Sequence, residues 1–297
     1  MTLPGAAETL RRTGLAADKR LGQHFLVDTA ILRRIALAAA PLDSGTVVEI
    51  GPGPGGLTKA LLDAGAGRVV AVERDPRWVA ALVPLVEHAG GRLEVVEGDA
   101  LRLDLDRLVP EGPVRIVANL PYNVATPLLL RWLEAAERIA VMVLMFQREV
   151  ARRLSAPAGS GAYGRLAVQA QWRCEVETLF DLPPGAFRPP PKVSSSVVRL
   201  RPRALPLHPA APGALAAVLA AGFGQRRKML RSSLAATGVE PLALTAAAGI
   251  NPTLRAESLP IEAWCRLARA LSALAPPGTS ARTPRDPAGG GDAAARR

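Results

Sequence analysis

The sequence contains few cysteines and few histidines. Its 297 residues include two cysteines, Cys174 and Cys265, and three histidines, His24, His88 and His208. Two isolated cysteines exclude a disulfide framework, a cysteine-built zinc cluster and an iron–sulfur ferredoxin. Three scattered histidines exclude most metal sites that are built from histidine. We therefore expect no metal centre.

Long apolar stretches are also missing. No segment approaches the ~18 apolar residues that a membrane span needs, and no apolar core with a cleavage site is visible at the N-terminus. We expect a cytoplasmic protein with no membrane contact. Hydrophobic residues make up 49% and charged residues 21%, an ordinary globular composition. A chain of this length can bury a sizeable core without disulfides or metals.

Acidic residues are outnumbered, and the imbalance is uneven along the chain. Lys and Arg number 37 and Asp and Glu 26, which gives a net charge of +11. Residues 41–144 carry a net charge of −4, so the positive excess lies in the flanking segments. Basic flanks suit a phosphate-rich partner such as RNA, but a solubilising surface has the same charge. The charge alone leaves both interpretations open.

Short apolar segments alternate with helix-compatible segments from residue 46 onward. Strands are expected at residues 46–50, 68–72, 93–96, 114–118 and 141–146. Helices are expected between them at residues 57–64, 77–88 and 126–136. This alternation is typical of a parallel sheet with both faces covered. The predicted fold class is α/β, a Rossmann-like doubly wound sheet that binds its ligand beyond the carboxyl ends of the strands.

The remaining chain predicts a second, smaller unit. Beyond a basic helix at residues 148–154 and a loop at 155–164, strands are expected at 166–172 and 193–200, and Ala- and Leu-rich helices at 215–223, 226–236, 242–248 and 261–274. Residues 276–297 have a composition typical of disorder. The predicted organisation is a flexible arm (1–18), an α/β domain (19–206), a smaller C-terminal helical domain (207–275) and a disordered tail (276–297).

A glycine-rich segment follows the first expected strand. Gly51, Gly53 and Gly56 have the G-x-G-x-x-G spacing. Glycine at such positions permits a sharp turn and a close approach of the backbone to a ligand. Together with Glu49 and Gly55, the segment is similar to motif I of S-adenosylmethionine-dependent methyltransferases.

Acidic residues follow the second and third expected strands. Glu73 comes 22 residues after Gly51, where a carboxylate can accept hydrogen bonds from ribose hydroxyls. Nicotinamide enzymes share that arrangement with S-adenosylmethionine enzymes. Asp99 can accept from the amino group of a cofactor adenine, or it can cap a helix. The residues alone leave both roles of Asp99 open.

The fourth expected strand ends in Asn119-Leu120-Pro121-Tyr122. This resembles the motif of methyltransferases that act on exocyclic amines. Adenine N6 is a poor nucleophile because its lone pair is delocalised, and acceptors for its two protons favour a pyramidal, reactive nitrogen. The Asn119 side-chain oxygen and the Leu120 carbonyl are the expected acceptors. Pro121 would rigidify the turn, and Tyr122 would stack on a flipped-out base.

Further segments resemble one family. They lie at residues 19–26, 147–154, 163–166, 187–193 and 223–234, and the likeness spans about residues 19–272. The family is the ribosomal RNA adenine dimethyltransferases, in particular its RsmA (KsgA) subgroup. The resemblance implies that S-adenosyl-L-methionine is used to dimethylate N6 of two adjacent adenosines in the 3′-terminal hairpin loop of 16S ribosomal RNA. The implied partner is the assembling small ribosomal subunit, and we expect a monomer.

The resemblance also assigns residues to roles. The cofactor contacts, with Gly53 from the glycine loop, are His24, Leu26, Gly51, Gly53, Glu73, Asp99 and Asn119. His24 stands where the family usually has Asn, and Ser194 where it usually has Asp. Two basic clusters suit phosphate contacts or, equally, solvated helix faces. They are Arg148, Arg152 and Arg153, and Arg226, Arg227, Lys228 and Arg231.

Three other functions compete with this one. An Erm-type methyltransferase, which modifies one adenosine of large-subunit RNA, shares the glycine loop and the Asn-Leu-Pro-Tyr segment, but residues 163–166 and 226–234 favour the small-subunit enzymes. A nicotinamide-dependent dehydrogenase would explain the glycine loop and Glu73, but not residues 119–122 or the basic flanks. A non-catalytic RNA-binding assembly factor would leave the intact cofactor and catalytic residues without a use.

Overall fold

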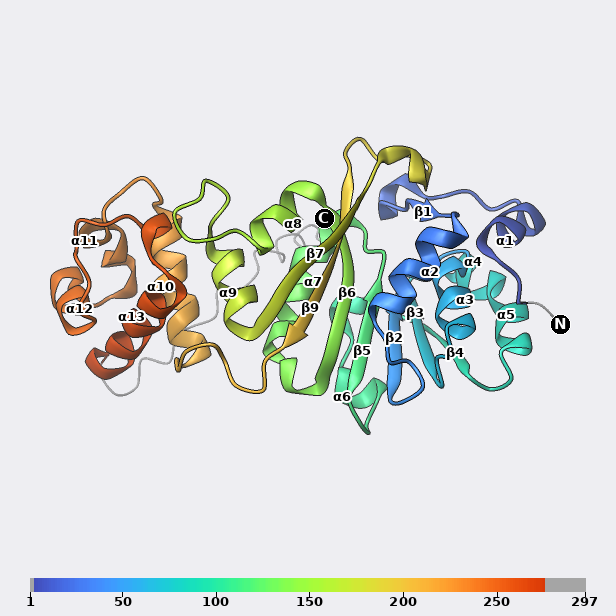
Figure 1. The fold of residues 1–297 in the computed structure, drawn as a ribbon, viewed down its shortest axis with the longest axis horizontal. Helices are drawn as coiled ribbons and strands as arrows, with labels where there is room; N and C mark the ends of the chain where they lie inside the picture. Colours follow the sequence, from blue (N-terminus) through green and yellow to red (C-terminus); the bar gives the residue numbers. More distant parts are fainter. Residues whose placement is uncertain (1–2, 276–297) are drawn as a thin grey trace, which may run out of the picture. The chain divides into compact units, whose positions relative to one another are not determined.

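A computed structural model describes residues 3–275, in which a mixed sheet is the central element (Figure 1). The parallel strands are β2 (Thr46–Ile50), β3 (Val69–Glu73), β4 (Leu93–Glu97), β5 (Val114–Ala118) and β6 (Ile139–Gln147). Strands β7 (Cys174–Leu182) and β9 (Ser195–Pro202) are antiparallel additions. In the described part the order is β4-β3-β2-β5-β6-β9-β7, and the predicted α/β class is confirmed.

Helices cover both faces of the sheet, which explains its nearly continuous apolar strands. Val47 and Val117 face a buried cluster that includes residues of α2 (Thr29–Ala38) and α3 (Gly56–Asp63). The next residues along the same strands, such as Val48, face a second cluster against α7. The remaining helices of this region are α4 (Pro76–Ala81), α5 (Val83–His88), α6 (Leu105–Leu108), α7 (Tyr122–Glu134), α8 (Arg148–Leu154) and α9 (Arg165–Arg173).

The N-terminal segment differs from the expected flexible arm. Residues Ala6–Thr13 form helix α1, in which Ala6 and Thr9 are buried. Arg12 Nη2 donates a hydrogen bond of 3.0 Å to the carbonyl of Ala81 at the end of α4. The apolar side chains of this segment pack on the Phe25 and Trp78 cluster. A helix of 8 residues is too short to be stable alone, so it is ordered by tertiary contacts, which the local sequence does not reveal.

Two further expectations were wrong. The strand expected at residues 166–172 is helix α9, whose buried residues Val168 and Trp172 have helical i, i+4 spacing. Strand β7 follows it and was missed because most of its residues are not buried. The helix expected at 226–236 begins only at Leu230, with α11 (Leu230–Ser233) continued by a 3-10 helix (Leu234–Thr237). Met229 before it is extended and forms a β-bridge with Arg255.

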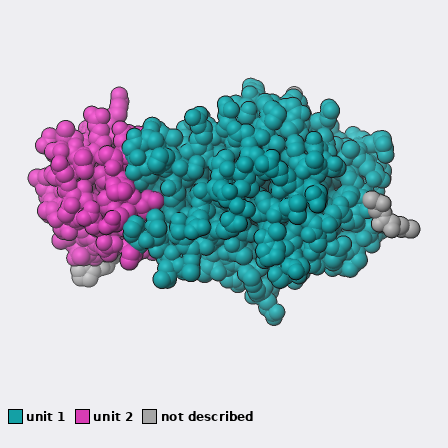
Figure 2. Space-filling view, viewed as in Figure 1, with its two compact units in different colours: residues 1–208 teal, residues 209–297 magenta. Residues whose placement is uncertain are grey.

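The chain divides into two compact units, Met1–His208 and Pro209–Arg297 (Figure 2). The described helices of the second unit are α10 (Pro212–Gly224), α11, α12 (Pro241–Ala247) and α13 (Ile261–Leu274). Helices α10 and α13 approach closely at Gly222, because a Cβ there would lie 2.4 Å from the ring of the buried Trp264. The tail predicted to be disordered lies outside the described residues.

Cys174 and Cys265 are free and buried, and burial raises their pKa values to about 12 and about 11. No group of three or more His, Cys, Asp or Glu side chains in residues 3–275 could hold a metal ion. None of the helices described is long and apolar enough to cross a membrane.

Candidate active site

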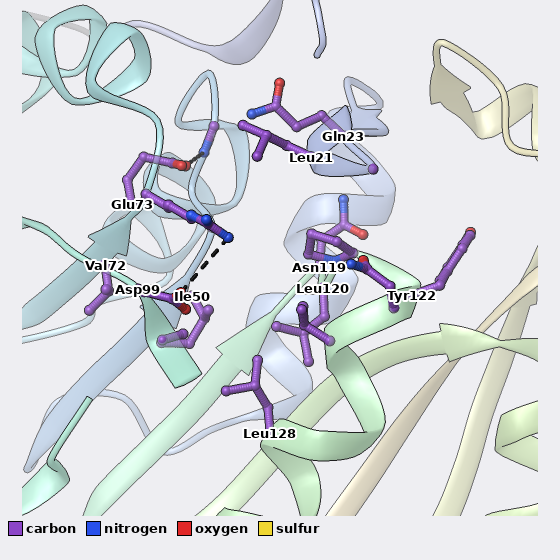
Figure 3. Close-up of a pocket in the computed structure, with 18 of the residues that line it drawn as sticks. Leu21, Gln23, Ile50, Val72, Glu73, Asp99, Asn119, Leu120, Tyr122 and Leu128 are labelled. Atoms are coloured by element: carbon purple, nitrogen blue, oxygen red, sulfur yellow. Dashed lines mark hydrogen bonds and ion pairs between the residues drawn. The ribbon is translucent and has the colours of Figure 1, made fainter. Parts of the chain in front are cut away.

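A pocket lies at the carboxyl ends of β2, β3, β4 and β5 (Figure 3). It contains about 1000 Å³ of empty space, its open mouth included. Strand β2 lies between β3 and β5, so the direction of chain winding reverses there, which is where doubly wound sheets bind ligands. In Figure 3, Glu73 and Asp99 lie on one side of the pocket, and Asn119 and Tyr122 on the other.

The glycine loop lets the backbone form one wall. Gly51 has a φ of +69°, and a Cβ there would meet no atom within 4 Å, so this position is open toward a ligand. Gly53 has a φ of +50°, and a Cβ there would lie 2.8 Å from Phe25 Cε1. Both positions therefore need glycine, the first for its backbone conformation and the second also for packing.

The Glu73 carboxylate is fixed at the end of β3 by the backbone. Its Oε2 accepts a hydrogen bond of 3.0 Å from the Gly53 N–H, and its Oε1 one of 2.8 Å from the Asp75 N–H. The side chain is 5% exposed, and burial raises its pKa while these bonds oppose the shift. Each carboxylate oxygen keeps a further lone pair, so Glu73 can accept hydrogen bonds from hydroxyl groups in the pocket.

Asp99 caps a helix and also lines the pocket. Its Oδ1 accepts a 3.0 Å hydrogen bond from the Leu101 N–H and thereby caps a short 3-10 helix. Its Oδ2 lies 3.8 Å from Arg74 Nη1. The side chain also lines the pocket, so that helix capping and ligand contact are compatible.

A second acid, Glu49, is buried behind the glycine loop. Its side chain is 1% exposed, and Oε2 has no hydrogen-bond partner within the described residues. Burial raises its pKa to about 8, and the negative charge of Glu73 adds to the shift. Glu49 lines a small cavity that Gly51 and Asn119 also line. The carboxyl group is therefore protonated over most of the acidic and neutral range.

The Asn119 amide is oriented by the N-terminal segment. Its Nδ2 donates a 2.8 Å hydrogen bond to the His24 carbonyl, which leaves Oδ1 as the acceptor atom of the side chain in the pocket lining. Leu120 anchors the segment because its side chain is 2% exposed and packs in the second cluster. The arrangement fits the acceptor role expected for Asn119.

Two rings lie next to each other at the same pocket. Tyr122 begins α7 and its hydroxyl lies 2.6 Å from Ser195 Oγ. His24 Nδ1 lies 2.7 Å from the Pro189 carbonyl, to which it donates. The ring centroids of His24 and Tyr122 are 6.1 Å apart, with 27° between the planes. Burial raises the pKa of Tyr122, so its hydroxyl stays protonated at neutral pH.

Gln23 attaches the N-terminal wall of the pocket, formed by residues 20–25, to the segment after β3. Its Oε1 accepts from the Asp18 N–H at 2.8 Å and from Trp78 Nε1 at 3.3 Å. Its Nε2 donates to Asp75 Oδ2 at 3.2 Å. Asp75 also holds Arg77, and that bonding lowers the pKa of Asp75. The sequence motif contains Gln23, but nothing in the spacing predicts these partners.

The structure brings most of the predicted cofactor residues together. The pocket lining includes His24, Gly51, Gly53, Glu73, Asp99 and Asn119. Leu26 instead pairs with Phe187 between the short strands β1 (Phe25–Leu26) and β8 (Phe187–Arg188), and lines the small cavity near Glu49. The segment 119–122, which the sequence predicts to be catalytic, lines the same pocket in full.

The basic residues differ in their surroundings. Arg148 and Arg152 are exposed on α8, line an open depression, and form no ion pair with the described residues. Arg153 pairs with Glu149 on the same helix. In the second unit Arg226 pairs with Glu257 at 2.8 Å. The others, Arg227, Lys228 and Arg231, are exposed.

Comparison with known proteins decides the family. A family model described as Ribosomal RNA adenine dimethylase matches residues 14–273. The chain belongs to this family. The match covers nearly all of the described structure, so it includes the residues on both sides of the pocket and the helices of the second unit.

Relatives of this dimethylase chain agree with that assignment. It is 56% identical over 273 residues to a Rhodopseudomonas palustris protein named Ribosomal RNA small subunit methyltransferase A, an alignment that covers 91% of this chain and 95% of the relative. A dimethyladenosine transferase structure from Plasmodium falciparum has a TM-score of 0.71 at 26% identity, covering 84% and 98% of the two chains. The 23S rRNA methyltransferase ErmE has a TM-score of 0.62 at 29% identity, covering 84% and 99%.

Membership of the dimethylase family makes this chain an S-adenosylmethionine-dependent methyltransferase. The nicotinamide dehydrogenase alternative is therefore wrong. The glycine loop and an acid after the second strand are common to both classes, so those features could not have separated them. The Asn119–Tyr122 segment could, because hydride transfer gives it no use.

Proposed function

We propose that the protein dimethylates N6 of two adjacent adenosines in the 3′-terminal hairpin loop of 16S ribosomal RNA. The observation that supports this best is the position of Asn119 and Tyr122 in the pocket that Glu73 and Asp99 line. The 56% identity to a relative named for the small ribosomal subunit favours the small-subunit substrate. ErmE is less similar, at 29% identity, so an Erm-type activity has less support.

The residues of the first half of the pocket suit the cofactor. We assign Glu73 to the ribose hydroxyls and Asp99 to the adenine amino group, because each carboxylate is held by backbone N–H groups and lines the pocket. The missing side chain of Gly51 leaves room for close contact with the backbone. When bound, S-adenosylmethionine supplies an electrophilic methyl group on a sulfonium.

The residues of the second half suit the target amine. Asn119 Oδ1 accepts a hydrogen bond from one N6–H, and the Leu120 carbonyl accepts one from the other, so that the nitrogen lone pair is directed toward the methyl group. Tyr122 offers an aromatic face to the extruded base. Holding the amine in line with the methyl group supplies much of the rate, because proximity and orientation replace a bimolecular encounter.

We assign the exposed basic residues that form no ion pair with the described residues to RNA phosphates. The RNA is bound within the assembling small subunit, and the protein acts as a monomer in the cytoplasm. On α8 these basic residues are Arg148 and Arg152. Replacing both with Ala should weaken RNA binding. The slope of the logarithm of the binding constant against the logarithm of the salt concentration should become less steep by about 0.7–0.9 per lost phosphate contact. Arg153→Ala is the matched control on the same helix, since Arg153 already pairs with Glu149. An unchanged slope in the double variant would remove α8 from the footprint.

A transfer assay with labelled methyl groups tests the substrate. Unmethylated small subunits, and separately large subunits, are incubated with the protein and labelled S-adenosylmethionine, and the labelled nucleotides are mapped. The proposal predicts dimethyladenosine at two adjacent positions near the 3′ end of the 16S RNA. Label at a single adenosine of 23S RNA would favour the Erm-type function, and no transfer to either subunit would favour a non-catalytic assembly role.

A further inference from the structure

A buried serine outside the pocket lining contacts the pocket through Tyr122. Ser195 is 0% exposed, and its Oγ lies 2.6 Å from the Tyr122 hydroxyl. These residues are 73 positions apart in the chain. A buried hydroxyl normally has a hydrogen-bond partner, but this partner is the aromatic side chain that the proposed function places against the target base.

The backbone of Ser195 is held from both sides. It is the first residue of β9 and pairs with Gln147 at the end of β6 and with Leu182 at the end of β7. The position of its Oγ is therefore set by the rigid sheet. Tyr122 is at the first turn of α7, is only half-buried, and has the His24 ring beside its own ring. The hydroxyl lies on the long axis of the ring, and anchoring it fixes where that axis points.

The segment that ends at Ser195 also holds the neighbouring ring. The Pro189 carbonyl, six residues earlier, accepts from His24 Nδ1 at 2.7 Å. The connection between β8 and β9, together with the first residue of β9, thus forms hydrogen bonds with the side chains of both His24 and Tyr122. Because the two rings lie near each other at 27°, their relative orientation depends on this connection.

We propose that Ser195 is a positioning residue of the methylation reaction, whose hydroxyl orients the Tyr122 ring before the RNA arrives. This inference rests on the proposed function, because it assumes that Tyr122 stacks on the target adenine. Without the hydrogen bond the ring samples other directions, and part of the binding energy of the base is then used to order it. The amine is aligned with the methyl group less often, so the loss falls on the chemical step.

The test is a double-mutant cycle of Ser195→Ala and Tyr122→Phe. Either variant removes one partner of the same hydrogen bond and keeps the ring. We expect each to lower kcat by about 3- to 10-fold, the range of one net hydrogen bond. The double variant should be no slower than the slower single variant, because only one interaction is lost. The affinity for S-adenosylhomocysteine should not change.

Ser196→Ala is the matched control. Ser196 is the next residue of β9, is 1% exposed, and donates to Asp181 Oδ1 at 2.6 Å. The same atom is deleted from the same strand, so a general disturbance of the sheet would appear in this variant too. We expect Ser196→Ala to lower the melting temperature about as much as Ser195→Ala while kcat stays at the wild-type value.

Three results would overturn the inference. They are an unchanged kcat in Ser195→Ala, additive losses in the double variant, and an equal loss of kcat in Ser196→Ala. If Ser195→Ala does not fold, Tyr122→Phe alone decides, since its hydroxyl can be removed without a buried cavity. Failure of the proposed function is a different outcome, because the wild-type protein itself would then not methylate the small subunit.

Discussion

The two halves of the pocket are built in different ways. The half of the pocket that we propose to bind the cofactor (the cofactor half) consists of residues at the ends of consecutive strands, such as Gly51, Glu73 and Asp99. Backbone N–H groups fix its carboxylates. The half that we propose to bind the target base (the base half) joins segments that are far apart in the chain. Asn119 bonds to the His24 carbonyl, and Tyr122 bonds to Ser195.

Because of this difference, the two halves need different features of the chain in order to form. Strand ends of a doubly wound sheet meet at one edge in any protein of this architecture, so the cofactor half needs only the right residues at those ends. The base half needs the bond from Asn119 to the His24 carbonyl and the contacts of the β8–β9 connection. We infer that changes in the first half act on cofactor affinity and changes in the second half act on the rate of transfer.

The largest expected effect is that of Asn119→Ala. The variant loses the side-chain acceptor for the amine, and the rate of methyl transfer should fall by about 100-fold or more, as for a lost stabilising group in other active sites. The affinity for S-adenosylhomocysteine, measured by calorimetry, should change less than about 10-fold. Equal losses in rate and affinity would show that the two halves do not act separately.

The converse test is Glu73→Gln. The glutamine replaces one acceptor oxygen with an N–H donor, which faces backbone N–H groups that Glu73 now satisfies. Cofactor affinity should fall by about 10- to 100-fold, since hydrogen bonds to a charged group are lost. The transfer rate at saturating cofactor should fall far less. A variant that binds normally but transfers slowly would reverse our assignment.

The buried Glu49, behind the glycine loop, makes the free energy of unfolding of the protein depend on pH. Burial raises its pKa from 4.5 to about 8, so the folded protein keeps a proton that the unfolded chain loses. The stability is complete below pH 4.5 and decreases as the pH rises toward 8, by about 1.4 kcal/mol per pH unit. The free energy of unfolding, measured with urea at several pH values in this range, should decrease less steeply with pH in Glu49→Gln. The exposed Glu87→Gln is the control. An unchanged slope would mean that the folded protein holds Glu49 ionised.

The smallest expected effect is that of Gln23→Ala. Two hydrogen bonds of this side chain join the N-terminal wall to Asp75 and Trp78, and a third is accepted from the Asp18 N–H within the N-terminal segment. Their loss should speed hydrogen exchange in the wall and weaken cofactor binding by about 3- to 10-fold. Arg11→Ala, at an exposed position of α1, should change neither. Rapid exchange without weaker binding would remove the wall from the cofactor half.

The sequence predicted local features better than contacts between distant segments. Strands β2 and β5 and helices α8 and α13 have the predicted bounds, because their apolar periodicity and their breakers are local. Helix α1 and the partner of Tyr122 were missed, since both depend on contacts between distant segments. Helix α9 was mistaken for a strand because a short apolar run fits either period.

A crystal structure with bound S-adenosylhomocysteine tests the account most directly. The account predicts ribose hydroxyls at hydrogen-bond distance from Glu73, the adenine amino group at Asp99, and the sulfur facing the side of the pocket that holds Asn119 Oδ1. A ligand bound elsewhere, or an Asn119 amide that turns its nitrogen toward the place of the incoming amine, would contradict it.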